Sequence, residues 1–172
     1  WTVPDVESAT CRVRVADASG SGLMDVSDGA FMIVSPPDEN NIAFGKTATD
    51  PSLTDGDITS SYILSANSAG QTVMVDLGSA YNVSAVMVYT GGKDLNERKQ
   101  TSLRGYAVEL SADNSRWEEV SVIHEIGVTN ASDGGYDYSR VSFPAEGARY
   151  VRIKLLEVRT TAPNIGEIMV FG

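Results

Sequence analysis

The sequence predicts an all-β fold of short antiparallel strands, packed as a sandwich or barrel. Apolar and polar residues alternate with a period of two in several short runs, and no stretch keeps a helical period. Between the runs stand Gly, Ser, Thr, Asp and Asn, which are typical of turns. Short strands with frequent turn residues between them favour a sandwich or barrel.

The first 35 residues predict an extra β segment. Residues 12–15 alternate and residues 31–34 form an apolar run, with a Gly/Ser/Asp-rich turn region between them, so we expect two strands of a hairpin or sheet edge. Pro36 and Pro37 then break the chain. A piece this short cannot bury a core of its own. Residues 1–35 loosely resemble the closing strands of an immunoglobulin-like or fibronectin-like domain, which implies that the chain is part of a multidomain protein.

Residues 36–172 carry the remaining predicted strands. Alternating apolar positions predict strands at Val73, Val75 and Leu77; at Val83, Ala85, Met87 and Tyr89; at Tyr106, Val108 and Leu110; and at Val151, Ile153 and Leu155. Residues 168–171 close the chain as another apolar run. We therefore expect one domain over residues 36–172, preceded by the β segment of residues 1–35.

Charge, apolar run length and cysteine content bear on the partners and the origin of the protein. The 23 acidic against 13 basic residues give a formal charge of −10, which argues against nucleic acid because phosphate binding needs a basic face. No run reaches the roughly 20 apolar residues of a membrane span, so we expect no membrane insertion. With one cysteine there is no internal disulfide, which fits a bacterial or a cytosolic protein better than a vertebrate extracellular domain.

Four motifs follow one another in the second part of the chain. They are residues 41–46 with 53–62 (NIAFGK, LTDGDITSSY), 73–78 with 83–89 (VMVDLG, VSAVMVY), 106–117 (YAVELSADNSRW), and 148–153 with 165–172 (ARYVRI, IGEIMVFG). In this order they resemble the coagulation factor V/VIII type C (discoidin) superfamily, and within it the family 32 carbohydrate-binding modules. The resemblance implies a discoidin-type jelly-roll β-sandwich of two antiparallel sheets.

A calcium site is the first functional expectation. Asp55, Gly56 and Asp57 form a polar turn with the hydroxyl of Ser60 close behind, and calcium prefers six to eight such oxygens. Taken alone, this turn is better explained as an ordinary polar turn. The family resemblance implies a structural Ca²⁺ held by Ser52, Asp55, Asp57, Ser60, Gly166 and Glu167. Asp57, Ser60 and Tyr62 replace the family's usual Asn, Thr and Trp, and the first two keep oxygen ligands.

A glycan site is the second expectation, since modules of this family bind sugars on loops at one end of the sandwich. Sugar rings stack on aromatic faces, and their hydroxyls need polar donors and acceptors. The resemblance and the residue types together nominate Lys93, Asn96, Arg98, Tyr136, Tyr138 and Arg159. The family's usual stacking aromatic before the final strand is absent here, which moves that role to Tyr136 or Tyr138. The alternatives are a solvated charged turn at residues 93–99 and a core position for Tyr138.

Three functional classes compete. Catalysis is disfavoured because the single His124 lies in an apolar-flanked strand and no nucleophile elbow or zinc motif is present. We expect a non-catalytic carbohydrate-binding module that targets a larger secreted or cell-surface protein, bacterial in origin, to a glycan. The alternative is a structural or adhesion module that binds a protein partner or acts as a spacer.

Overall fold

A computed structural model of the chain describes residues 8–19, 21–29, 31–33, 40–64, 70–90, 99–127, 137–158 and 163–172, with backbone only for residues 8–11 and 31–33. Most of these residues lie in strands, and every strand pair is antiparallel. None of the helices described is long and apolar enough to cross a membrane.

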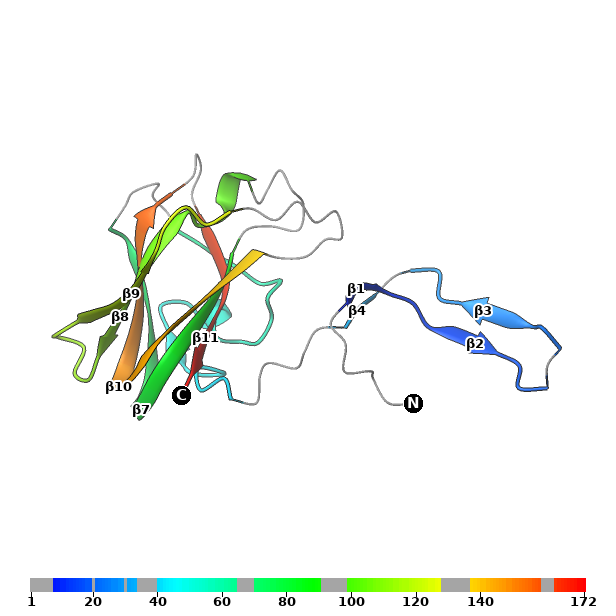
Figure 1. The fold of residues 1–172 in the computed structure, drawn as a ribbon, viewed down its shortest axis with the longest axis horizontal. Coiled ribbons are helices and arrows are strands. Elements are labelled where there is room, and N and C mark those ends of the chain that lie inside the picture. Colours follow the sequence, from blue (N-terminus) through cyan, green and yellow to red (C-terminus); the bar gives the residue numbers. More distant parts are fainter. Residues whose placement is uncertain are drawn as a thin grey trace.

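The sandwich is built around two long strands, β7 (Thr72–Thr90) and β10 (Asp137–Glu157). The register between them is interrupted between the pairs Tyr150–Asp76 and Ala148–Tyr81, so each strand contributes one half to each of two sheets. Figure 1 shows both strands running across the sandwich. This sharing explains why one continuous hydrogen-bonded ladder forms two packed layers.

The remaining strands pair with one half or the other of β7 and β10. The first sheet adds β5 (Thr47–Ala48), β8 (Gly105–Ser111) and β9 (Glu118–Ile123). The second adds β6 (Tyr62–Ile63) and β11 (Asn164–Phe171), which pairs with the second half of β7. A short 3-10 helix, η1 (Pro51–Leu53), precedes β6 and is capped by the carboxylate of Asp50. The predicted all-β jelly-roll sandwich of two antiparallel sheets is confirmed.

One core lies between the sheets. Alternate residues of the first half of β7, of β8 and of the second half of β10 are fully buried in it, as the sequence pattern predicts, and β11 adds Ile168 and Val170. Tyr106 is also inside, and its hydroxyl forms a 2.7 Å hydrogen bond with Ser139. Burial raises the pKa of Tyr106 to about 12.

The predicted face of residues 83–89 is wrong in one respect. Val83 belongs to the main core, whereas Ala85, Met87 and Tyr89 lie on the other side of the sheet, and Val86 and Val88 are the inward residues. The change of face falls between Val83 and Val86, next to the irregular pairing of β7 with β10 at Val83–Glu146 and Ala85–Ser142. A strictly alternating pattern does not continue through this part of β7, since both Val83 and Val86 are fully buried.

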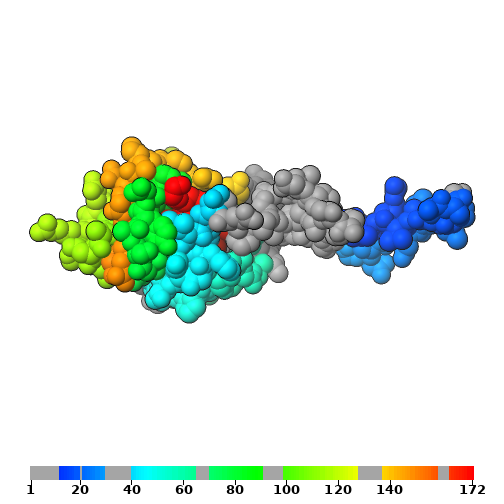
Figure 2. Space-filling view, turned by 90° about the horizontal axis from the view of Figure 1, so that it is seen from below, coloured from blue at the N-terminus to red at the C-terminus, as the bar shows by residue number. Residues whose placement is uncertain are grey.

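The N-terminal residues form two ladders of their own. β1 (Ser8–Cys11) pairs with β4 (Phe31–Ile33), and β2 (Arg14–Ala16) pairs with β3 (Met24–Val26). Figures 1 and 2 show these strands reaching away from the sandwich. The expected pairing of residues 12–15 with 31–34 is wrong. The Gly/Ser/Asp-rich region, where the sequence predicts only a turn, contains strand β3. The Asp17 carboxylate accepts hydrogen bonds from Ser19 and Ser21 and closes the turn between β2 and β3.

Deletion of residues 1–35 is expected to leave the sandwich folded. Its hydrophobic core is built from residues 42 onward within the described part of the chain, so the deletion removes no described core contact. The free energy of unfolding of residues 36–172, obtained from thermal melting, should lie within about 1 kcal/mol of the value for the full chain, because changes away from the core have small effects. A truncated protein that fails to fold, checked by circular dichroism, would place residues 1–35 in the same folding unit.

Candidate functional site

The residues predicted to bind calcium come together at the edge of the second sheet. β6 pairs with β11 only through Asn164 and Ile165, so the chain just before β6 runs beside Gly166 and Glu167. This places the turn of residues 52–60 against the end of the chain, more than a hundred residues away in sequence. The backbone N–H of Gly56 donates a 3.3 Å hydrogen bond to Oε2 of Glu167.

Oxygen atoms from four residues of the turn converge on one point. The Ser60 hydroxyl lies 2.8 Å from the carbonyl of Asp57, 3.1 Å from Oδ2 of Asp55 and 3.3 Å from the carbonyl of Ser52. The carboxylate of Asp57 is turned to Thr59, from which it accepts two hydrogen bonds. The carbonyl of Asp57, not its carboxylate, is therefore the oxygen directed at Ser60.

Glu167 is the exceptional group of this cluster. Its side chain is fully buried, and Oε1 has no hydrogen-bond partner. Burial raises the pKa of Glu167 to about 7, the Gly56 hydrogen bond opposes the rise, and the charges of Asp55 and Asp57 add to it. A buried carboxylate beside two others and without a cation is costly, because removal from water disfavours its ionised form.

These oxygens fit a hard cation such as Ca²⁺. Calcium accepts carboxylate, hydroxyl and carbonyl oxygens at flexible geometry, which is the donor set of Ser52, Asp55, Asp57, Ser60 and Glu167. Over the described ranges no three His, Cys, Asp or Glu side chains form a metal-binding group. One reason is the orientation of Asp57, which directs its carbonyl into the cluster, so that three of the five gathered donors are carbonyl or hydroxyl oxygens. A bound cation would give the Oε1 atom of Glu167 its missing partner.

Gly166 has a spacing role in this arrangement. A Cβ atom at this position would lie 2.8 Å from the carbonyl oxygen of Ile58 and 3.2 Å from that of Ser60. The register of β11 against β7 is interrupted between Ile165 and Glu167, as in a β-bulge. The missing side chain and the bulge together let the turn approach Glu167. The carbonyl of Gly166 as a ligand stays a prediction.

Gly166→Ala is expected to destabilise the domain by about 1–3 kcal/mol, the usual cost of overpacking, because backbone atoms of residues 58–60 must move. Chemical or thermal unfolding measures this. Gly127→Ala is the matched control, since a Cβ there meets nothing within 4 Å. Equal stability of Gly166→Ala and Gly127→Ala would show that the turn does not need this close approach.

Of the predicted sugar contacts, Tyr138 alone is described, and it lies on the surface. Its side chain is 59% exposed, so the core alternative for this residue is wrong. Lys93, Asn96, Arg98, Tyr136 and Arg159 lie outside the described residues. In sequence they flank the ends of β7, β10 and β11, where Thr90 pairs with both Asp137 and Ile165.

Tyr138 forms an aromatic pair that the sequence analysis missed. It stands opposite Tyr89 in the ladder, and the two ring centroids are 5.5 Å apart with planes inclined at 41°. Two residues further on, Arg140 lies with its guanidinium 4.5 Å from the centre of the Phe171 ring. We call Tyr89, Tyr138 and Arg140 the tyrosine face. The available signal was alternation: Ser139 is buried between Tyr138 and Arg140, and Val88 is buried next to Tyr89.

The single histidine lies at the surface as well. Nδ1 of His124 is 2.8 Å from Oε1 of Glu157, and Nε of Arg104 is 3.4 Å from Oε2 of the same carboxylate. The side chains of His124 and Arg104 are both more than half exposed. The group is a surface ion-pair cluster, in which the carboxylate orients the imidazole.

Comparison with known families identifies the domain. The sequence model of the F5/8 type C domain family matches residues 39–171, which is most of the chain. The chain belongs to the F5/8 type C domain family. The discoidin resemblance of its four motifs is thereby confirmed. No curated protein matches this chain in sequence.

Solved structures similar to this F5/8 type C domain include carbohydrate-binding modules. Chitosan-binding module 1 of a chitosanase/glucanase from Paenibacillus sp. IK-5 is 26% identical with a TM-score of 0.57, over 77% of this chain and 98% of that one. The CBM32 module of AlyQ, in complex with 4,5-unsaturated mannuronic acid, is 27% identical with a TM-score of 0.52, over 70% and 82%.

A third similar structure shares the fold at lower identity. CpGH89CBM32-5 from Clostridium perfringens, in complex with GalNAc-β-1,3-galactose, is 17% identical with a TM-score of 0.59, over 73% of this chain and 93% of that one. By contrast, the F5/8 type C domain spans 31% of truncated AlyQ, which joins a CBM32 to an alginate lyase domain. In AlyQ and in the Paenibacillus chitosanase/glucanase, the similar module is therefore part of a larger enzyme.

Proposed function

We propose that this F5/8 type C domain is a non-catalytic carbohydrate-binding module that attaches a larger secreted protein to a glycan. The observation that carries the proposal is the aromatic pair of exposed Tyr138 and half-buried Tyr89 near the ends of β10 and β7. Aromatic rings on a rigid strand offer a stacking surface for the C–H face of a pyranose. Arg140 on the same face supplies donors for hydroxyl groups.

The neighbouring structures support the same class of ligand. One is a chitosan-binding module, one is in complex with 4,5-unsaturated mannuronic acid, and one is in complex with GalNAc-β-1,3-galactose. We extend this class of ligand to the tyrosine face of this chain, without choosing among these sugars. Lys93, Asn96, Arg98, Tyr136 and Arg159 remain the proposed polar and stacking contacts beside the tyrosine face.

A structural Ca²⁺ belongs to this proposal. Ser52, Asp55, Asp57, Ser60 and Glu167 would hold it, and it would join the turn of residues 52–60 to the last strand. Such a clip stabilises the folded chain by restricting a long loop. It stands at the edge of the second sheet, so its proposed role is stability of the sandwich and not contact with the sugar.

The proposal excludes catalysis by this domain itself. In the part of the chain that the structure describes, His124 bonds to Glu157 and not to a hydroxyl or thiol nucleophile. The acidic composition favours a neutral or weakly charged glycan over a polyanion. A shallow surface site predicts dissociation constants in the micromolar to millimolar range, about −4 to −8 kcal/mol.

A glycan array of the calcium-loaded, folded protein tests the proposal. Binding to at least one neutral or weakly charged glycan is the expected result. Silence across the array, with native melting, would contradict it and favour the alternative of an adhesion or spacer module. The N-terminal strands that reach away from the sandwich are the observation in favour of that alternative.

A further inference from the structure

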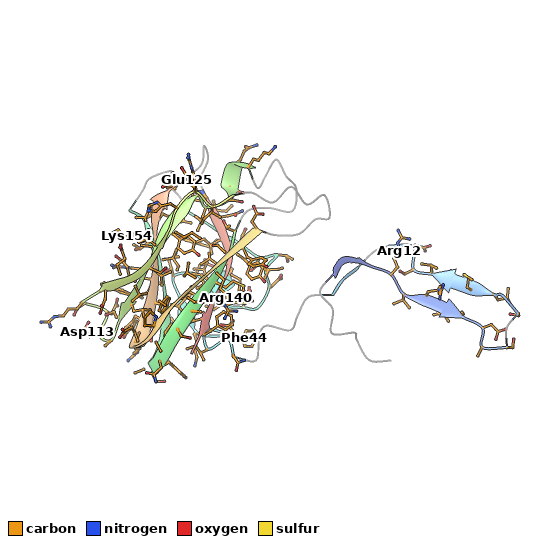
Figure 3. The ribbon with its side chains drawn as sticks, viewed as in Figure 1. Arg12, Phe44, Asp113, Glu125, Arg140 and Lys154 are labelled. Carbon is orange, nitrogen blue, oxygen red and sulfur yellow. The ribbon has the colours of Figure 1, made fainter. Side chains whose placement is uncertain are left out.

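A hollow of about 400 Å³ lies at the end of the sandwich formed by the turn between β8 and β9. Its lining includes Trp117, Asp113, Arg116, Glu118, Glu146 and Gly147. Figure 3 shows Asp113 at this end of the sandwich and Glu125, at the far end of β9, at the other. In Figure 2 the same turn forms the tip of the molecule away from the N-terminal strands. The volume falls within the usual range of small-ligand pockets.

The aromatic wall of the hollow is held in place from behind. The guanidinium of Arg152 lies 4.0 Å from the centre of the Trp117 ring. Nε of Arg152 is 2.5 Å from Oε2 of the buried Glu109, and Lys154 lies 3.7 Å from the other oxygen. Arg152 does not line the hollow, so it holds the indole from another side. A ring fixed in this way loses little freedom when a ligand packs on it.

The charged groups of the hollow divide into two kinds. The carboxylate of Asp113 is occupied, because it accepts hydrogen bonds from the backbone N–H groups of Ser115 and Arg116. By contrast, Glu118, Glu146 and the guanidinium of Arg116 form no ion pair or side-chain hydrogen bond among the described residues. The hollow thus combines a fixed indole, two available carboxylates and one available guanidinium.

This combination selects the chemistry of a ligand. An indole face suits the C–H face of a pyranose, and Arg116 suits its hydroxyl oxygens as a donor. The three carboxylates outnumber the single guanidinium, so the hollow attracts positive charge and repels a uronate or sulfate. A carboxylate bonded to a protonated amine forms a charge-assisted hydrogen bond, which is stronger than a neutral one.

We propose that this hollow is a second saccharide site, separate from the tyrosine face, that binds a pyranose carrying a protonated amino group. Trp117 stacks on the ring, Glu118 and Glu146 accept from the ammonium group, and Arg116 donates to a hydroxyl oxygen. Two sites at different places on one domain would let it bind two segments of one amino-sugar polymer.

The two tryptophans of the chain make the test direct. In the full chain carrying Trp1→Phe, Trp117 is the sole source of indole fluorescence and of the indole N–H resonance. Titration with a glucosamine tetramer should shift both signals, with saturation. The fully N-acetylated tetramer should bind about tenfold more weakly, because it lacks the positive charge. An unmoved Trp117 signal, or equal affinity for both tetramers, would overturn the proposal.

Variants separate this site from the tyrosine face. Glu118→Gln with Glu146→Gln should weaken the Trp117 response to the glucosamine tetramer about tenfold or more. Glu119→Gln, on the same strand but outside the lining, should leave it unchanged, as should Tyr138→Ala. Loss of the Trp117 response in Tyr138→Ala, or an unchanged response in the double variant with native melting, would contradict an independent site. If Tyr138→Ala abolishes binding on the glycan array but keeps the Trp117 response, the tyrosine face and the hollow are independent sites.

Discussion

Removal of calcium is expected to lower the melting temperature of this domain by about 10 °C at neutral pH. A ligand bound only by the folded state adds about 2.7 kcal/mol at a hundredfold excess over its Kd, and each kcal/mol shifts melting by about 2–8 °C in domains of this size. The specific reason is Glu167, whose buried Oε1 has no partner without a cation. Scanning calorimetry with and without EDTA measures the difference.

Two variants sharpen the calcium experiment. Asp55→Ala removes a carboxylate that lies within hydrogen-bond distance of Ser60, so this protein should melt early and be insensitive to chelator. Asp28→Ala removes an exposed carboxylate from the N-terminal strands and should keep the full response to EDTA. Identical melting of wild type with and without EDTA would refute the calcium assignment.

Without calcium, the domain is expected to become less stable as the pH rises from about 5 to about 8. Burial raises the pKa of Glu167 from its ordinary value of 4.5 to about 7, so the folded state prefers the protonated form. Its stabilising contribution is complete below the unfolded pKa and is lost as the pH rises through the folded one. The loss amounts to about 3 kcal/mol.

Glu167→Gln isolates this effect. The neutral amide keeps the shape of the protonated acid, so the chelated variant should be more stable than chelated wild type at pH 8 and no longer respond to calcium. Because every other titrating group is retained, the difference between the two proteins reports Glu167 alone. Asp76 and Asp113 have lowered pKa values through Arg149 and through backbone N–H groups, respectively, and lose their stabilisation only at lower pH. If the free energy of unfolding changes with pH in the same way for the chelated variant and the chelated wild type, the burial argument is wrong.

The oxygen cluster proposed to hold calcium could be anticipated from the sequence, because its residues lie in two short motifs. Asp55, Asp57 and Ser60 are close in sequence, and Glu167 was supplied by the family pattern of the last strand. The atoms themselves could not be anticipated. Whether Asp57 presents its carboxylate or its carbonyl depends on the hydrogen bonds of Thr59, which are set by the folded turn.

The tyrosine face and the hollow show where sequence patterns fail. Tyr89 reads as one of four residues on a single face, but the alternation is not continuous between Val83 and Val86, so Tyr89 lies on the outer face beside Tyr138. Trp117 reads as a motif residue of a hairpin. Its role as a wall depends on Arg152 and Glu109 from other strands, which only the tertiary pairing brings together. Periodicity predicts strands, whereas surfaces depend on how the strands are paired.

The measurement that tests the central proposal most directly is calorimetric titration of an array-positive glycan into wild type, Tyr138→Ala and Tyr138→Phe. Tyr138→Ala should bind about tenfold or more weakly, about 1.4 kcal/mol, with unchanged melting because the ring is 59% exposed. Tyr138→Phe keeps the stacking ring and should bind within about threefold of wild type. Val122→Ala, at another exposed apolar position, should bind as wild type does. Wild-type affinity in Tyr138→Ala would show that the tyrosine face does not bind the glycan.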